Sequence, residues 1–275
     1  MHKLIISSFI LILISSCKKT EYIIENLNNN KIMVFGHGGM GVKSNYPIDT
    51  FESIINCLKT GADGSEMDVQ VTKDSVLVAY HPKYLEDNTN INGMINTLTW
   101  EEVKKARFKS LPYLKYSIIS LDELFQNINN PPRYHYTFDC KSYNAPTADG
   151  FTFYTQFSNA LIKIIEKYNL QNSVFIESRE KDFLAMLKSK RSDYMLFTYP
   201  LNFEEGLAIA QELNLYGITT STADITKDQI ALAHSKNIRV AIWNIDTKKK
   251  NRDAILKNPD FIQTDNLKYL MKLLE

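Results

Sequence analysis

Two acidic residues interrupt a run that otherwise has the pattern of a buried strand. Glu66 and Asp68 lie between Gly64 and Val71, and both fall on one face because strand side chains alternate between the two faces. Two like charges about 7 Å apart repel one another, and a hard cation with oxygen ligands relieves that repulsion most simply. The pattern predicts a cation site. The alternative is that the two carboxylates form the solvated face of an edge strand.

Other residues that could do chemistry stand at the ends of predicted strands. His37 lies in a glycine-rich loop, residues 36–41, that follows the predicted strand 31–35, and His81 directly follows the extended run 76–80. Imidazoles titrate near neutral pH, so two of them at one site could exchange the roles of acid and base. The remaining candidates at predicted strand ends are Asp139, Lys141, Glu177 and Trp243.

The order of the predicted elements indicates how these residues meet. From residue 31 onward the pattern of a strand followed by a helix occurs eight times, without enough residues for a second domain. We therefore predict one (β/α)8 barrel (TIM barrel) over residues 31–275, in which chemistry collects at the carboxyl ends of the strands. A doubly wound sheet is the competing fold. The predicted strands cover about 31–35, 64–71, 134–141, 173–177, 194–197, 217–220, 239–243 and 261–264.

The segment from about residue 82 to 116 departs from this alternation. It contains loop-forming sequence at residues 87–93 and a short helix that begins at Thr99 with a capping-box signature. Because the segment is too long for a simple connection, we predict a small insertion after the second strand region, lying as a lobe over the site.

Composition narrows the class of partner. The chain has 275 residues, of which 44% are hydrophobic, and a net charge of +1. This is ordinary globular composition without a global field that would recruit nucleic acid. We therefore expect a small-molecule substrate, bound at a local site and not at a large charged surface.

The first residues resemble the signal peptide of a bacterial lipoprotein. A basic start precedes an apolar run, residues 4–14, that is too short to span a bilayer as a mature helix, and two serines stand before Cys17. The resemblance implies removal of residues 1–16, lipidation of Cys17, and an exported protein held at a bacterial cell membrane by its lipid alone. Residues 17–30 are then predicted to be a tether. An ordinary signal peptide or a short membrane anchor is the alternative.

Longer motifs, in their order along the chain, resemble those of glycerophosphodiester phosphodiesterases. The resemblance spans about residues 32–266 and implies a TIM barrel that binds one divalent cation, Ca²⁺ or Mg²⁺. It also implies hydrolysis of glycerophosphodiesters to glycerol 3-phosphate and an alcohol, or hydrolysis of a related phosphodiester. The matching motifs are Gly36-His37-Gly38-Gly39, Pro47-Ile48-Asp49-Thr50, Glu66-x-Asp68, Thr72-x-Asp74, Val78-x-x-His81, Phe138-Asp139-Cys140-Lys141, Ile242-Trp243-Asn244 and Ile262-Gln263-Thr264-Asp265.

The resemblance also implies roles for individual residues. Lys141 would face the phosphate, although the pattern alone also fits a solvated lysine at a strand end. Trp243 is either a wall of the substrate site or ordinary barrel packing, and Glu177 is a candidate partner of a metal ligand or of Lys141. The candidate roles are metal ligation by Glu66, Asp68 and Asp139, acid–base catalysis by His37 and His81, and substrate binding by Lys141, Trp243 and Glu177.

The chain also departs from the family pattern. The family usually has an arginine where this chain has Gly38, a glutamate and an asparagine where it has Ile48 and Asp49, and a glutamate where it has the shorter Asp139. Losing a phosphate-gripping arginine together with a carboxylate preserves the local charge but changes the geometry. Three functions therefore stay open: a hydrolase, a lyase that releases a cyclic phosphate, and a non-catalytic surface lipoprotein that binds a phosphorylated head group or a glycan.

Overall fold

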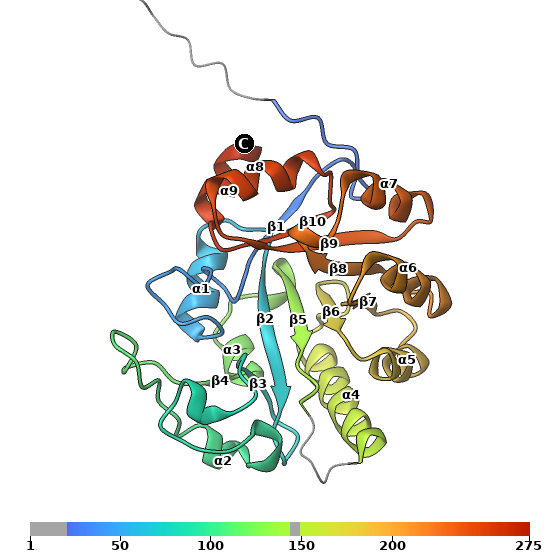
Figure 1. Cartoon of the computed structure of the whole chain (residues 1–275). Helices are drawn as coiled ribbons and strands as arrows, with labels where there is room; N and C mark the ends of the chain where they lie inside the picture. The colour runs from blue at the N-terminus through green and yellow to red at the C-terminus, as the bar shows by residue number, and fades with distance from the viewer. Residues whose placement is uncertain (1–20, 144–148) are drawn as a thin grey trace, which may run out of the picture.

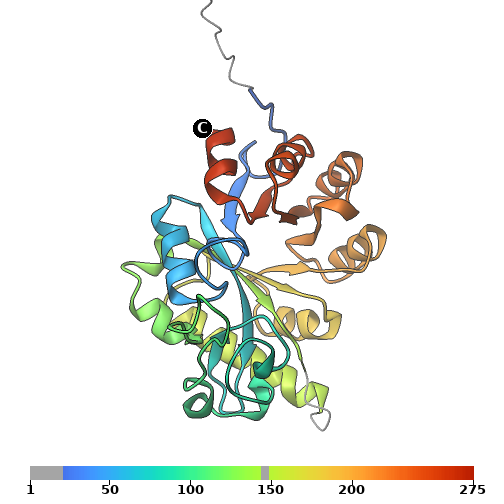
Figure 2. The ribbon, with the colours of Figure 1, turned by 60° about the vertical axis from the view of Figure 1, so that its left-hand side comes forward.

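A computed structural model describes residues 21–143 and 149–275 of the chain. Eight parallel strands close into a barrel with helices on the outside (Figures 1 and 2), and β10 pairs with β1 to complete the ring. Closure confirms the predicted (β/α)8 barrel, because a doubly wound sheet would be open at two edges. In order around the barrel, the strands are β1 (Met33–Gly36), β2 (Gly64–Val71), β5 (His135–Cys140), β6 (Val174–Ser178), β7 (Met195–Thr198), β8 (Gly217–Ser221), β9 (Arg239–Ile245) and β10 (Phe261–Thr264).

The outer helices begin where side chains can cap their free N–H groups. Thr50, Ser120, Asp149, Asn202, Thr226 and Thr247 each accept a hydrogen bond from the backbone N–H three residues on. The helices are α1 (Phe51–Lys59), α3 (Leu121–Gln126), α4 (Gly150–Lys167), α5 (Lys181–Lys190), α6 (Phe203–Glu212), α7 (Lys227–Ser235), α8 (Lys248–Leu256) and α9 (Leu267–Leu274).

One predicted helix boundary was wrong. Because proline is favoured in the first turn of a helix, the sequence pattern predicts that the first helix begins at Pro47, but α1 begins at Phe51. Asp49 has a φ of +62°, in the left-handed region, which ends any right-handed turn there. Residues 47–50 are therefore a turn that leads into the helix, and this turn places Asp49 beside β2.

The barrel interior changes character along its axis. Phe175, Phe197 and Phe261 pack together with Phe35 in edge-on and tilted pairs, and all four are buried. A fully buried side chain of this size contributes about 1.5–3 kcal/mol through the hydrophobic effect. Two residues further along the strands the inward positions become polar or amphipathic, so the aromatic cluster closes the barrel beneath a polar site. Those positions include Glu177, Gln263 and Trp243.

Two short antiparallel strands, β3 (Leu77–Ala79) and β4 (Ile119–Ser120), extend the sheet from β2. The chain segment that connects β3 to β4 forms a separate small lobe. It contains α2 (Trp100–Val103), whose capping box at Thr99 is present as predicted. Short 3₁₀ turns, η1 (Leu85–Asp87) and η2 (Ile95–Thr97), complete it, and its apolar residues form their own cluster. This lobe covers the segment predicted as an insertion. Further turns are η3 (Pro131–Arg133) and η4 (Thr222–Asp224).

The described part of the N-terminal segment is fastened to the barrel. Asn26 Nδ2 donates to Pro259 O at 2.8 Å, and Leu27 N donates to Asp260 Oδ1 at 2.8 Å. Arg239 Nε donates to Asn28 Oδ1 at 3.0 Å. These contacts lie at the amino ends of β9 and β10. Residues 1–16 and Cys17 fall outside the described ranges, and among the described helices none is long and apolar enough to cross a membrane.

Candidate active site

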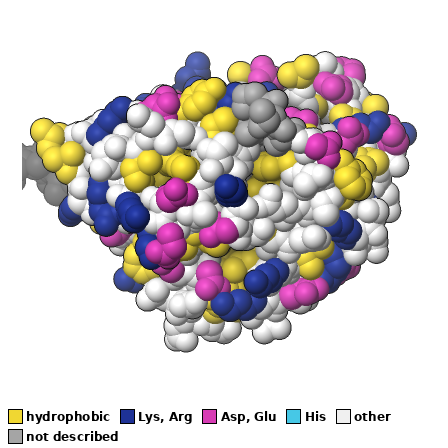
Figure 3. All heavy atoms as spheres, turned by 90° about the horizontal axis from the view of Figure 1, so that it is seen from below, with side chains coloured by type: hydrophobic (Ala, Val, Ile, Leu, Met, Phe, Trp, Pro, Cys, Tyr) yellow, Lys and Arg dark blue, Asp and Glu magenta, His cyan; other side chains and the backbone are white. Residues whose placement is uncertain are grey.

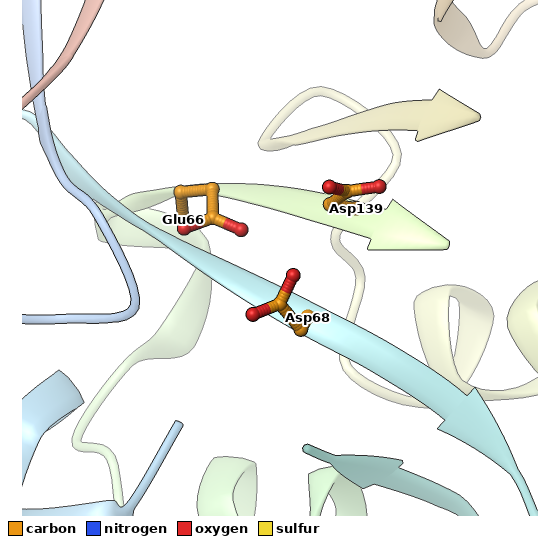
Figure 4. A group of neighbouring side chains, drawn as sticks. All are labelled: Glu66, Asp68 and Asp139. Carbon is orange, nitrogen blue, oxygen red and sulfur yellow. The ribbon is translucent and has the colours of Figure 1, made fainter. Parts of the chain in front are cut away.

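Three carboxylates meet toward the carboxyl ends of β2 and β5. Glu66 and Asp68 stand two residues apart on β2, and Asp139 on β5 lies in register with Asp68. One carboxylate oxygen from each lies within 4.8 Å of the others, and Figure 4 shows the three side chains on these neighbouring strands. Glu66 and Asp68 are each 2% exposed, so they do not form the solvated face of an edge strand. Two separate segments thus bring three acidic groups to one place, as the sequence predicted.

Lys141 partly balances this negative charge. Its Nζ lies 2.9 Å from Asp68 Oδ1 and 2.5 Å from Asp139 Oδ2. Burial would lower the pKa of Lys141, but the charges of Asp68 and Asp139 outweigh it and hold that pKa well above the usual value. Lys141 therefore remains protonated and turns toward the carboxylates, where one positive charge faces three acidic groups.

The carboxylates present the donor set of a hard divalent cation. Asp68 Oδ2 is buried and has no hydrogen-bond partner among the described residues, and an unpaired buried polar atom costs about 1–3 kcal/mol. Burial and the charge of Asp68 raise the pKa of Glu66 well above its usual value, because this pair resists carrying two charges. Oxygen ligands in this number suit Ca²⁺ or Mg²⁺. The residues present therefore fit such an ion.

Asp49, which was assigned no role from the sequence, supports this group from behind. Its Oδ1 accepts a hydrogen bond from Asp68 N at 3.0 Å, and the residue is 3% exposed. Burial, followed by the charges of Asp68 and Glu66, raises the pKa of Asp49 well above its usual value. These effects favour the uncharged form of Asp49, in which it adds no further negative charge to the group.

His37 is held by a further carboxylate, Asp265, which stands in a family motif but was assigned no role from the sequence. His37 Nδ1 lies 2.9 Å from Asp265 Oδ1, and Asp265 directly follows β10. Burial would lower the pKa of His37, but the hydrogen bond to Asp265 and the charges of Glu66, Asp265 and Asp68 raise it to about 9. With Nδ1 engaged, Nε2 is the ring nitrogen left to act on a substrate.

His81 reaches the same cavity from the other side of β2. It follows β3 and is exposed to solvent. Burial would raise the pKa of Asp68, but the charges of Lys141 and then of His81 lower it. His81, like His37, lines the cavity that contains these carboxylates. The two predicted histidines therefore border one site and do not lie at opposite ends of the barrel.

All eight predicted site residues line one cavity of about 690 Å³. Many of its lining residues lie at or just beyond the carboxyl ends of the barrel strands. Figure 3 shows one face of the molecule, on which acidic, basic and hydrophobic side chains are intermixed. Lining residues that the sequence analysis did not single out include Tyr143, Arg179 and Tyr199. The predicted residues in this lining are His37, Glu66, Asp68, His81, Asp139, Lys141, Glu177 and Trp243.

Glu177 has different partners from those predicted. Its Oε1 accepts hydrogen bonds from Thr219 Oγ1 at 2.6 Å and from Gln263 Nε2 at 2.8 Å. Burial and the charge of Asp139 raise the pKa of Glu177 to about 8. Lys141 pairs instead with Asp68 and Asp139, so Glu177 is a largely neutral group at neutral pH that lies on the cavity wall.

Gly38 and Ile48, two departures from the family pattern, contact each other. Gly38 has a φ of +56°, and a Cβ atom there would lie 2.4 Å from Ile48 Cβ. The space that a side chain at position 38 would need is therefore filled by Ile48. Gly38 N donates to Glu66 Oε2 at 2.6 Å, so this turn also helps to hold a candidate metal ligand.

Three residues of the site, Asp49, Arg179 and Asp265, were assigned no role from the sequence. Two of them stand at a position that the strand pattern marks as a candidate, directly after a strand. Arg179 directly follows β6 and Asp265 directly follows β10, so the rule that led to His37 also covers them. Asp49 had no such signal, because its position depends on the left-handed turn before α1.

Comparison with known proteins indicates the same family as the sequence motifs. The sequence profile of the glycerophosphoryl diester phosphodiesterase family matches residues 40–268. A glycerophosphodiester phosphodiesterase of Caldanaerobacter subterraneus is 27% identical over 247 residues, which is 88% of this chain and 98% of that protein. A glycerophosphodiester phosphodiesterase of Bacillus altitudinis is 22% identical over 238 residues, which is 84% of this chain and 94% of that protein.

Solved structures agree on the fold. A phosphodiesterase of Oleispira antarctica in complex with the product sn-glycerol-3-phosphate has a TM-score of 0.77 at 16% identity, with 88% of this chain and 96% of that chain covered. A glycerophosphodiester phosphodiesterase of Parabacteroides distasonis has a TM-score of 0.73 at 20% identity, with 88% of this chain and 96% of that chain covered.

Proposed function

Because the chain belongs to the glycerophosphoryl diester phosphodiesterase family, a family of phosphoric diester hydrolases, we propose that it hydrolyses glycerophosphodiesters to glycerol 3-phosphate and an alcohol. The observation that carries this proposal is that Glu66, Asp68 and Asp139 converge in a cavity that both His37 and His81 also line. A non-catalytic binding protein would have no need of all five groups together.

The first part of the mechanism is binding of an anionic substrate in an acidic pocket. Glu66, Asp68 and Asp139 would hold one divalent cation, Ca²⁺ or Mg²⁺, which when bound would neutralise phosphate oxygens and polarise the phosphorus centre. The Lys141 ammonium, 2.9 Å from Asp68, offers a further positive charge to the phosphate. The aromatic cluster beneath the site keeps water from reaching it through the barrel.

The second part is proton transfer by the histidines. We assign His37 as the base that takes a proton from the attacking hydroxyl and His81 as the acid that protonates the leaving alkoxide. The carboxylates Glu66 and Asp68 help to keep His37 protonated, so balancing their charge lowers its pKa toward the range in which it can act as a base. Asp265 holds the ring so that Nε2 faces the reacting groups.

The reaction would run in two steps. A neighbouring hydroxyl of the glycerol attacks phosphorus and forms a cyclic phosphate, while the alcohol leaves with a proton from His81. Water then opens the cyclic phosphate with the two histidines in exchanged roles, because each now holds the proton state left by the first step. Glycerol 3-phosphate is the product, and a solved structure of a similar protein contains that compound.

The test is an assay of the purified protein with a glycerophosphodiester and added Mg²⁺ or Ca²⁺, followed by phosphorus NMR. We expect glycerol 3-phosphate, and a His37→Ala variant slower by about 10²–10⁴-fold. Accumulation of the cyclic phosphate would show a lyase instead. A wild-type protein that binds the cation but turns over no phosphodiester would contradict the proposal and favour the non-catalytic binding protein.

We also propose that the chain is exported and anchored through a lipid on Cys17. Residues 26–28 are bound at the amino end of the barrel, opposite the cavity, so an anchor there would leave the cavity mouth free. Labelling with a fatty-acid analogue in a bacterial host should mark the wild-type chain and not Cys17→Ser. Equal labelling of both would contradict lipidation at this residue.

A further inference from the structure

Two cationic side chains stand at the same level above the carboxylates. Lys141 directly follows β5 and Arg179 directly follows β6, and Asp139 and Glu177, two residues earlier on each strand, pair in register. Side chains two residues apart on a strand share a face. Both cations therefore lie on the cavity side, and both line the cavity.

These two cations differ in what they contact. Lys141 is held by Asp68 and Asp139. Arg179 is exposed, and within residues 21–143 and 149–275 it forms no ion pair. The carboxylate beside it, Glu180, accepts a hydrogen bond from the hydroxyl of Tyr154 on α4 at 3.2 Å. The guanidinium instead lies over the ring of Tyr199, 4.1 Å from its centroid.

Tyr199 is part of an aromatic wall that leads back to the catalytic histidine. The Tyr199 and Trp243 rings pack edge to face with centroids 5.6 Å apart, and the Trp243 and His37 rings lie 6.3 Å apart. Trp243 Nε1 is buried and has no hydrogen-bond partner among the described residues. An indole N–H can donate a hydrogen bond but not accept one. Along this wall the Trp243 indole N–H is thus a donor without a partner among the described residues, and the exposed Arg179 guanidinium supplies further N–H donors.

These features favour one class of head group. A cationic head group, such as a quaternary ammonium, binds to open aromatic faces, but Arg179 covers the face of Tyr199 and its charge repels another cation. A head group rich in acceptor oxygens would instead accept hydrogen bonds from the Trp243 indole and from the Arg179 guanidinium. An unpaired buried donor such as Trp243 Nε1 gains most from such a partner.

Building on the phosphodiesterase function proposed above, we propose that Arg179 and Trp243 form the subsite for the leaving head group and select acceptor-rich, uncharged or anionic head groups over cationic ones. The substrates of this class are glycerophosphodiesters of polyols or of phosphorylated alcohols. Substrates that carry a fixed ammonium group are the disfavoured class.

The experiment compares kcat/KM for four diesters: glycerophosphoglycerol and glycerophosphoinositol against glycerophosphocholine and glycerophosphoethanolamine. For the wild type we expect a preference of about tenfold for the first pair, since one like-charge contact near a protein surface changes binding by about that factor. Arg179→Gln should reduce the preference by about fivefold or more, partly by raising kcat/KM for the cationic pair. Arg179→Lys should retain the discrimination against choline because the charge remains.

Two further variants separate the donors from the general packing. Trp243→Phe keeps a ring but removes the N–H donor, so it should lower kcat/KM for the polyol pair without raising it for the cationic pair. Arg133→Gln is the matched control, because Arg133 also lies over a tyrosine ring, that of Tyr134, but stands two residues before the amino end of β5. It should leave all four values unchanged.

The outcomes distinguish this subsite from the catalytic function itself. An equal loss on all four substrates in Arg179→Gln would overturn the proposal, because Arg179 would then act on the phosphodiester that they share. A wild type without any preference between the pairs would also overturn it. Binding of the same diesters to His37→Ala, by isothermal titration calorimetry, does not depend on turnover. A preference there with an inactive wild type would support the subsite and contradict the phosphodiesterase function.

Discussion

Asp139 lies in register with Asp68 on the neighbouring strand, and Lys141 Nζ contacts both carboxylates. The register brings the negative charges of Asp68 and Asp139 side by side. The positive charge of Lys141, two residues beyond Asp139, offsets part of the repulsion between them. This relationship makes the protein without a bound cation depend on Lys141, and the first prediction follows from it.

Replacing Lys141 should weaken the fold most when no cation is present. Lys141→Gln leaves Asp68 and Asp139 without their buried partner, which should lower the free energy of unfolding by about 3–5 kcal/mol in EDTA. Added Mg²⁺ or Ca²⁺ should restore part of that loss. Urea unfolding with and without the cation measures both values. Lys167→Gln, which removes an exposed ion pair with Asp122, is the control and should change little. An equal effect of both variants would contradict the account.

Asp265 should act through His37. Asp265→Asn removes the charge that helps to raise the pKa of His37 to about 9, so that pKa should fall. Because the amide orients the His37 ring less firmly than the carboxylate, kcat should also fall, by about 10- to 10³-fold. Proton NMR of the imidazole resonances measures the pKa. Asp246→Asn serves as the control, since that carboxylate pairs with Lys43 and Lys250 and not with a histidine. An Asp265→Asn protein with an unchanged His37 pKa would disagree with the structure.

The Gly38–Ile48 contact should block a simple return to the family pattern. Gly38→Arg places a Cβ against Ile48 and forces a non-glycine residue into a φ of +56°. We expect a loss of about 2–4 kcal/mol in stability. The double variant Gly38→Arg with Ile48→Gly should recover more than about 1 kcal/mol of this loss, because glycine removes the Cβ and Cγ2 atoms that a Cβ at position 38 would meet. Additive effects of the two substitutions in urea unfolding would show that the side chains do not clash.

Stability of the cation-free protein should fall as the pH rises from about 4.5 to about 9. The pKa of His37 is raised from 6.5 to about 9 and that of Glu177 from 4.5 to about 8, so over these ranges the folded state binds more protons than the unfolded state. The free energy of unfolding therefore decreases with rising pH, from 4.5 to 8 through Glu177 and from 6.5 to 9 through His37. Glu177→Gln should flatten the first part of this decline in EDTA. A steeper decline in that variant would contradict the assignment.

The sequence was sufficient for the fold and for most of the cavity lining because both follow from local rules. Alternation on a strand placed Glu66 and Asp68 on one face, and the carboxyl-end rule placed His37, Asp139 and Trp243 at one end of the barrel. These rules do not depend on how side chains pack against each other. They therefore hold even though the chain differs from its family at several positions.

The partners of those residues could not be predicted in the same way. That Asp265 holds His37, or that Glu177 bonds to Thr219 and Gln263, depends on register between strands that are distant in the sequence. Asp49 reaches Asp68 through a left-handed turn that the sequence pattern had assigned to a helix. Side-chain direction beyond a strand end is set by packing, which only the folded structure shows.

The central claim is that Glu66, Asp68 and Asp139 hold a divalent cation that the phosphodiesterase reaction requires. The most direct measurement is the rate of glycerol 3-phosphate release during titration with Mg²⁺ or Ca²⁺ after EDTA treatment. We compare wild type with Asp139→Asn and with the control Asp246→Asn. The account predicts no activity before the cation is added, recovery in wild type and control, and at least about a tenfold higher cation requirement in Asp139→Asn. Full activity in EDTA, or an unchanged cation requirement in Asp139→Asn, would contradict it.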